Sequence, residues 1–70
     1  MLPKIGEMNM FEYAMNLVRE KINFLANTTM TEAEVYLGVS NISDEIRAFL
    51  TQSGWRALYV EQGIFQLNRL

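Results

Sequence analysis

The chain has 70 residues, half of them apolar, with eight acidic and six basic residues and a net charge of −2. This length corresponds to one domain, the apolar content excludes a disordered chain, and the charge gives no long-range attraction for polyanions. The chain contains no Cys and no His, which excludes disulfides and the usual zinc sites.

A domain this small buries only about 60% of its unfolded surface and has little stability to spare. Small scaffolds obtain additional stability from disulfides, metals or oligomerisation, and only the last is compatible with this composition. No apolar run approaches the roughly 18 residues that span a bilayer, and no secretory signal is recognisable. We therefore expect a cytoplasmic protein that binds no cofactor and no metal and does not associate with membranes.

The N-terminal residues 1–7 hold the only Pro and are expected to form an arm ahead of a single domain over residues 8–70. The strongest helix signal follows, from Asn9 to Ala26. Asn9 is placed to cap this helix, and Glu12 stands three residues later, as in a capping box. Tyr13 and the residue before the cap, Met8, are placed to pack together across the first turn.

Two apolar stripes run along this predicted helix. The first repeats every three or four residues, as in a coiled-coil seam, and consists of Met8, Phe11, Met15, Val18, Ile22 and Leu25. The second consists of Met10, Ala14, Leu17 and Phe24. Either both stripes lie in one core, or the second contacts the same helix of another subunit and forms a homodimer interface. The polar face has few cations, which disfavours a helix lying on a membrane surface.

The next segment predicts a turn or very short strand at residues 27–29, followed by a second, short helix. Thr31 is placed to cap it, with Glu34 at the third position. Gly38 is placed to end it, because Gly accepts the left-handed conformation found after helix ends. A third helix is predicted to begin within residues 40–43 and to end at Gly54, and its buried side chains are expected to be Ile46, Phe49 and Leu50.

Residues 55–70 predict a β-hairpin. A two-residue loop at Gln62 and Gly63 would give one apolar face to Leu58, Val60, Phe65 and Leu67. A three-residue loop would set Leu58 opposite Gln66 and mix the faces. Because strand register follows the buried face, we expect the two-residue loop or a four-residue loop of equal parity. Trp55 is expected to close one end of the core.

From Thr31 onward the chain resembles winged helix-turn-helix domains. The features that carry the resemblance are the short helix before Leu37-Gly38-Val39-Ser40, the Ser53-Gly54-Trp55 junction and the terminal hairpin. The expected fold is therefore α+β, with three helices followed by a C-terminal β-hairpin. In this family the helix at residues 43–53 would enter the DNA major groove, and the hairpin would contact the backbone or minor groove.

The resemblance implies a set of nucleic-acid contacts by position. The exposed readers would be Asn41, Ser43, Asp44, Arg47 and Thr51, and the phosphate contacts would be Arg56 and Arg69. Three arginines per subunit are few for phosphate neutralisation. Two other interpretations apply to them: Arg47 forms a surface pair with Asp44, and Arg56 and Arg69 solvate the edge of the hairpin's apolar face.

Two functions follow from different classes. The first is a small DNA-binding regulator that acts as a homodimer on double-stranded DNA. The second is a winged-helix interaction module, such as a small phage-type inhibitor or adaptor, that binds a protein. Trp55 and Tyr59 would then anchor a partner or pack internally, rather than stack on single-stranded nucleic acid. We do not expect an enzyme, because the chain has no His or Cys and the neighbouring carboxylate pairs lie in first turns of predicted helices, where capping explains them. These pairs are Glu32 with Glu34 and Asp44 with Glu45.

Overall fold

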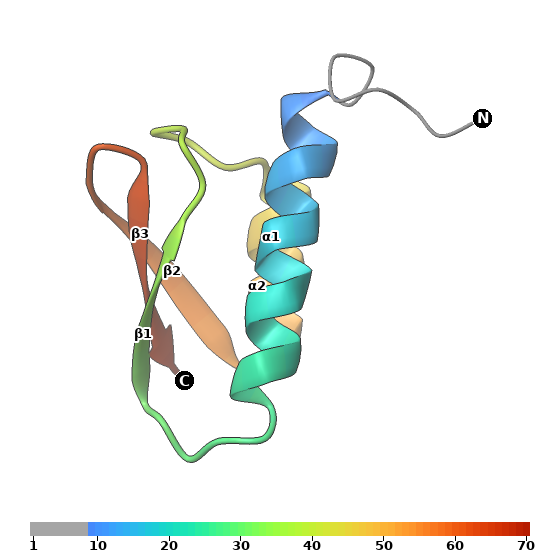
Figure 1. Cartoon of the computed structure of the whole chain (residues 1–70). Helices are drawn as coiled ribbons and strands as arrows, with labels where there is room; N and C mark the ends of the chain where they lie inside the picture. The colour runs from blue at the N-terminus through green and yellow to red at the C-terminus, as the bar shows by residue number, and fades with distance from the viewer. Residues whose placement is uncertain (1–8) are drawn as a thin grey trace.

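The computed structural model describes residues 9–70 of the chain. Two helices and three strands follow one another in the order α1, β1, α2, β2 and β3 (Figure 1). The predicted arm over residues 1–7, and the Met8 side of the predicted first-turn contact, lie outside the described residues.

Helix α1 (Met10–Leu25) confirms the strongest sequence signal. Asn9 precedes it in an extended conformation, and its Oδ1 accepts a hydrogen bond from the Glu12 backbone N–H at 2.8 Å. The cap satisfies one of the unpaired amide groups of the first turn. The buried side chains recur at intervals of three and four residues on one face of the helix, and they are Ala14, Val18, Ile22 and Leu25.

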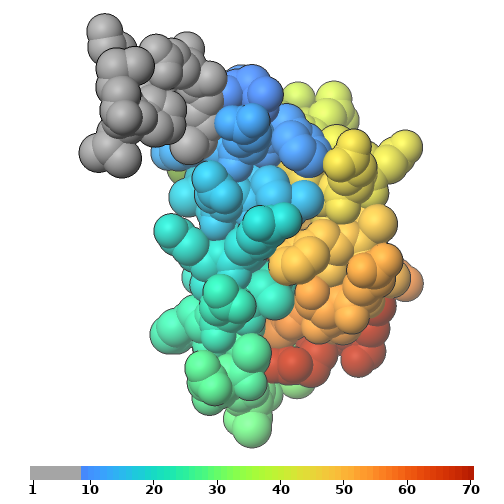
Figure 2. Space-filling model, turned by 90° about the vertical axis from the view of Figure 1, so that its right-hand side faces the viewer, coloured from blue at the N-terminus to red at the C-terminus, as the bar shows by residue number. Residues whose placement is uncertain are grey.

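Helix α2 (Asp44–Gln52) also confirms a predicted element. The Ser43 hydroxyl accepts a hydrogen bond from the Ile46 N–H at 3.2 Å and caps the helix. Ile46 and Leu50 are buried, and Phe49 packs against the core while partly exposed. Helices α1 and α2 lie side by side on one face of the sheet, as the views in Figures 1 and 2 agree.

The three strands form one antiparallel sheet in the order β1-β3-β2. Strand β3 (Ile64–Arg69) is central, so β1 (Glu32–Tyr36) and β2 (Trp55–Glu61) are both edge strands. The core lies between the sheet and the two helices, and its largest fully buried side chains are Trp55 and Phe65. Neither helix of the described residues lies over the opposite face of the sheet (Figure 1).

The prediction of a second helix at Thr31 is wrong, because Glu32–Tyr36 is strand β1. The described fold therefore has two helices and a three-stranded sheet, not three helices and a hairpin, although the α+β class is confirmed. Capping at Thr31 is worth only about 1 kcal/mol, and a helix this short is unstable alone. As a strand, the segment buries Ala33 and Val35 on the side of α1 and completes the hydrogen bonding of β3. Burial of the Val35 side chain alone contributes about 1.5–3 kcal/mol.

The two-residue hairpin loop is confirmed, but the predicted apolar face is wrong. Gln62 and Gly63 both have positive φ, and Glu61 lies opposite Ile64. A bulge between Tyr59 and Glu61 then shifts the register, so Leu58 lies opposite Gln66. Leu58 is 52% exposed as a result.

The physical reason for the bulge is the burial of the largest side chain. Without the extra residue, Leu58 would lie opposite Leu67 on the core side, and Trp55 would point to the other face. With it, Ala57 lies opposite Leu67, and Trp55 is almost completely buried. Burying an indole ring removes more apolar area from water than burying Leu58 would.

The hairpin loop also packs closely against the residues that follow β1. Gly63 O accepts hydrogen bonds from the Leu37 N–H at 2.8 Å and from the Gly38 N–H at 3.2 Å. A Cβ added to Gly63 would lie 2.7 Å from the Gly38 Cα. Only glycine therefore fits at Gly63, both for its positive φ and for this close approach.

Candidate interaction surface

Arg69, predicted as a phosphate contact, is bonded within the fold. Its Nε donates to the Met30 carbonyl at 2.9 Å, and its Nη2 donates to the Thr28 carbonyl at 3.3 Å and the Leu25 carbonyl at 3.5 Å. Its guanidinium carbon lies 4.4 Å from the centre of the Trp55 ring. The side chain thus ties the α1–β1 connection to the end of the sheet, and its Nε and Nη2 groups are occupied by carbonyls of its own chain.

Arg47, predicted as a base reader, also contacts its own chain. Its Nη1 donates to the Ala57 carbonyl at 3.4 Å. Ala57 lies on edge strand β2, so this bond covers part of the edge of the sheet. Arg56 lies opposite Asn68, whereas Arg69 lies opposite Trp55. The two arginines that were predicted to share a face therefore lie on opposite faces of the sheet.

The other predicted reading residues lie before and within α2. Asn41 and Thr51 are exposed, and Ser43 uses its hydroxyl as the helix cap. Asp44 is also exposed and lies in the acidic first turn of this helix. The structure thus brings one arginine, Arg47, to these positions, and this arginine donates to Ala57.

The predicted dimer interface is divided by the fold. Ala14 is buried in the core of its own chain, which is a correction to its assignment to an interface, and Leu17 is partly buried against that core. Met10 and Phe24 are 56% and 60% exposed, but they lie about 21 Å apart along the helix axis. Homodimerisation through α1 stays a prediction, with Met10 and Phe24 as its exposed positions.

The helix-free face of the sheet, which we call the open face, exposes large apolar side chains that the sequence analysis did not assign to a site. Tyr36 from β1 is 65% exposed, and Leu58 from β2 projects from the same face. Gln66 of β3 pairs with Leu58 on one side and with Glu34 on the other, and Tyr36 pairs with Ile64 of the same strand. The alternation of Glu32, Glu34 and Tyr36 with apolar residues is the sequence signal that could have revealed this face.

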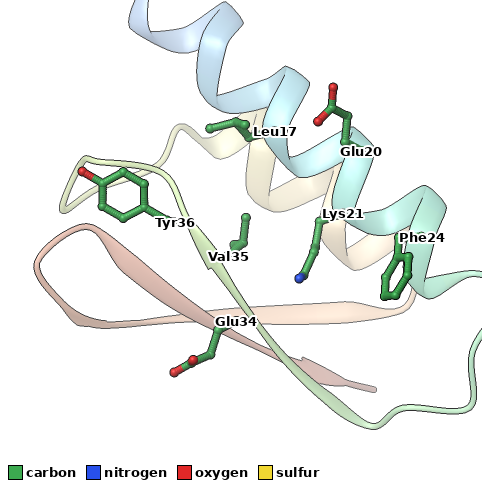
Figure 3. Close-up of a pocket in the computed structure, with 7 residues that line it drawn as sticks. All are labelled: Leu17, Glu20, Lys21, Phe24, Glu34, Val35 and Tyr36. Atoms are coloured by element: carbon green, nitrogen blue, oxygen red, sulfur yellow. The ribbon is translucent and has the colours of Figure 1, made fainter.

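A groove of about 440 Å³ lies between α1 and β1 (Figure 3). Leu17, Glu20, Lys21 and Phe24 line it from α1, and Glu34, Val35 and Tyr36 line it from β1. Val35 points toward the helix, whereas the carboxylates of Glu20 and Glu34 point away from the space between helix and strand (Figure 3). The Lys21 amine lies 5.9 Å from the centre of the Phe24 ring. The α1 wall therefore presents the apolar side chains of Leu17 and Phe24 and the Lys21 amine, with the Glu20 carboxylate directed away from the strand.

A second hollow, of about 340 Å³, is lined by Glu32, Ala33, Glu34 and Gln66. The two hollows share the strand β1, one on its α1 side and one reaching its open face. An edge strand with a recess beside each face has space for the side chains of an added strand, since successive side chains point to opposite faces.

Within residues 9–70, no other strand pairs with the outer edge of β1. Thr31 O accepts a hydrogen bond from the Arg69 N–H, and the Leu37 N–H donates to Gly63 O, each at 2.8 Å. Odd-numbered residues of the segment therefore direct their backbone groups to β3. By the alternation of an antiparallel ladder, Glu32, Glu34 and Tyr36 direct theirs to the free edge.

No model of a known protein family matches the chain, and no curated protein or solved structure matches it. In residues 9–70, no three acidic side chains gather as metal ligands would. Neither helix of the described part has the length and apolarity required to cross a membrane.

Proposed function

We propose that this protein is an interaction module that binds a protein partner through its sheet. The observation that carries the proposal is the open face, where Tyr36 and Leu58 expose large apolar side chains and neither described helix lies over them. Exposed apolar groups set among polar ones are typical of protein–protein interfaces, and Tyr is enriched there.

The engagement of the arginines also favours a protein partner over DNA. Arg47 and Arg69 donate to backbone carbonyls of their own chain, and the net charge of the chain is −2. Nucleic-acid binding depends on several free cations that neutralise phosphates. Arg56 is exposed, but one cation on the open face does not make a phosphate-binding surface.

Capture with matched variants tests this function. The immobilised wild-type chain and the double variant Tyr36→Ser, Leu58→Ser are exposed to a nuclease-treated lysate of the native host. Because both side chains are exposed, the double variant should stay folded, which circular dichroism checks. Tyr13→Ser, at an exposed position on α1 away from the open face and outside the predicted dimer interface, is the matched control.

The expected result is a protein retained by the wild type and by Tyr13→Ser but lost by the double variant. In parallel, we expect no binding to mixed-sequence duplex DNA at 50 mM salt, where electrostatic binding is strongest. Salt-dependent duplex binding that disappears in Arg56→Ala, with no protein retained, would replace the proposal with a nucleic-acid function.

A further inference from the structure

We propose that β1 is a docking strand, to which an extended segment of the partner adds as a fourth, antiparallel strand of the sheet. The segment alternates apolar residues, which face α1, with Lys or Arg residues, which face Glu32 and Glu34. This inference rests on the proposed function and names the kind of partner segment. Strand addition to a sheet edge is a general mode of peptide recognition, in which the backbone gives affinity and alternate side chains give specificity.

The two edges of the sheet differ in their availability. On β2, the Arg47 guanidinium reaches the Ala57 carbonyl, and α2 packs along the strand. On β1, the backbone groups of Glu32, Glu34 and Tyr36 point to the free edge, and grooves flank the strand on both faces. A ligand strand therefore has space for pairing at β1.

The groove on the α1 side determines the apolar half of the ligand pattern. Residues of an added strand that lie opposite Ala33 and Val35 point to the same face as these residues. There they meet Leu17, Phe24 and the alkyl chain of Lys21 (Figure 3). These surroundings favour aliphatic side chains in the ligand.

The open side of β1 determines the basic half of the pattern. Glu34, at the centre of the strand, and Glu32 project there, two residues apart. Opposite charges directly across two strands stabilise their pairing by about 0.2–1 kcal/mol. A ligand with Lys or Arg at two positions, separated by one apolar residue, therefore complements the docking strand.

The same charges disfavour a second copy of this chain as the occupant. A two-fold pairing that uses all of β1 centres on Glu34 and sets it opposite its own symmetry copy. Like charges directly opposite each other destabilise an antiparallel pair. A basic segment of another protein removes this repulsion.

A displayed library of random linear eight-residue peptides, selected on the full chain, tests the inference. We expect enrichment of peptides that alternate apolar and basic residues. NMR shift changes on adding the best synthetic peptide should concentrate at Glu32–Tyr36 and the facing side of α1. N-methylation of the peptide amides that bond β1 should abolish binding, whereas methylation of the alternate amides should preserve it.

Charge reversal supplies the matched comparison. Glu34→Lys should weaken the selected basic peptide by about two- to thirty-fold, because an attraction becomes a repulsion of similar size. Glu34→Lys should also strengthen the binding of a second peptide, in which Glu replaces the Lys of the selected peptide. Glu61→Lys makes the same charge change on β2 and should leave the affinity within about two-fold.

Several results would overturn the docking strand: no enriched peptide, enrichment without alternation, shift changes confined to β2, or equal effects of the two substitutions. A dimer that forms through β1, detected as twice the monomer mass in solution, would assign the edge to a second copy instead. If host capture still depends on Tyr36 and Leu58 in any of these cases, the interaction function stands and only the strand-addition mode fails. If capture fails as well, both proposals fail.

Discussion

Replacing Arg69 with Ala should destabilise the fold by about 2–3 kcal/mol. The substitution removes three hydrogen bonds to the carbonyls of Met30, Thr28 and Leu25 and the contact with the Trp55 ring. The 2.9 Å bond to Met30 is worth about 1 kcal/mol, and the two longer bonds about half as much each. The cation–π contact at this exposed position adds about 0.5–1 kcal/mol.

Urea denaturation followed by circular dichroism measures this loss, and the melting temperature should fall by about 10–20 °C for a domain of this size. Arg56→Ala is the matched control, because Arg56 is an exposed arginine on the open face, and it should change stability by no more than about 0.5 kcal/mol. Arg69→Lys should be intermediate, because Lys keeps the charge but not the planar array of donors. Equal stability of Arg69→Ala and Arg56→Ala would refute the structural role of Arg69.

Two further predictions test the hairpin. Gly63→Ala should lower the free energy of unfolding by at least about 3 kcal/mol, since it adds a clash to the roughly 1–2 kcal/mol of a left-handed conformation. Gly54→Ala, with open space around its Cβ position, should cost only the conformational part. Equal unfolding free energies of the two variants would contradict the close packing at Gly63. Leu58→Ala should change stability by less than about 1 kcal/mol, whereas Leu67→Ala should cost about 2–5 kcal/mol in the same denaturation assay. A similar loss in both variants would indicate that Leu58 is buried, as in the register without the bulge.

Helices with strong local signals were predictable from the sequence. Asn9 and Ser43 place their caps within a few residues of the amide groups that they satisfy, so these signals act without distant contacts. The buried face of α1 was also predictable, because Val18, Ile22 and Leu25 recur at the helical interval.

The β1 segment was not predictable in this way. Thr31 and Glu34 carry the chemistry of a helix start, while Ala33 and Val35 alternate with charged residues as in a half-buried strand. Local signals alone do not decide between these states. The choice depends on β3, which is some thirty residues away along the chain and forms the ladder with β1.

The candidate interaction surface was even less accessible from the sequence. Leu58 was predicted to be buried, and its exposure follows from the bulge that turns Trp55 inward. Arg69 was predicted to contact phosphate, but it donates to carbonyls of residues that lie 39 to 44 positions earlier in the chain. The positions of both side chains in the fold depend on contacts that local sequence does not determine.

By itself, the sequence determined the α+β class, the two capped helices, the two-residue hairpin loop and the lack of Cys and His chemistry. Each of these depends on residue type or on neighbours within about four positions. Only the tertiary structure decided that Glu32–Tyr36 is an edge strand, that the hairpin slips by one residue, and that Arg47 and Arg69 serve the fold. These outcomes depend on which apolar side chains compete for one small core, and burial in that core outweighs the weaker local preferences of the backbone.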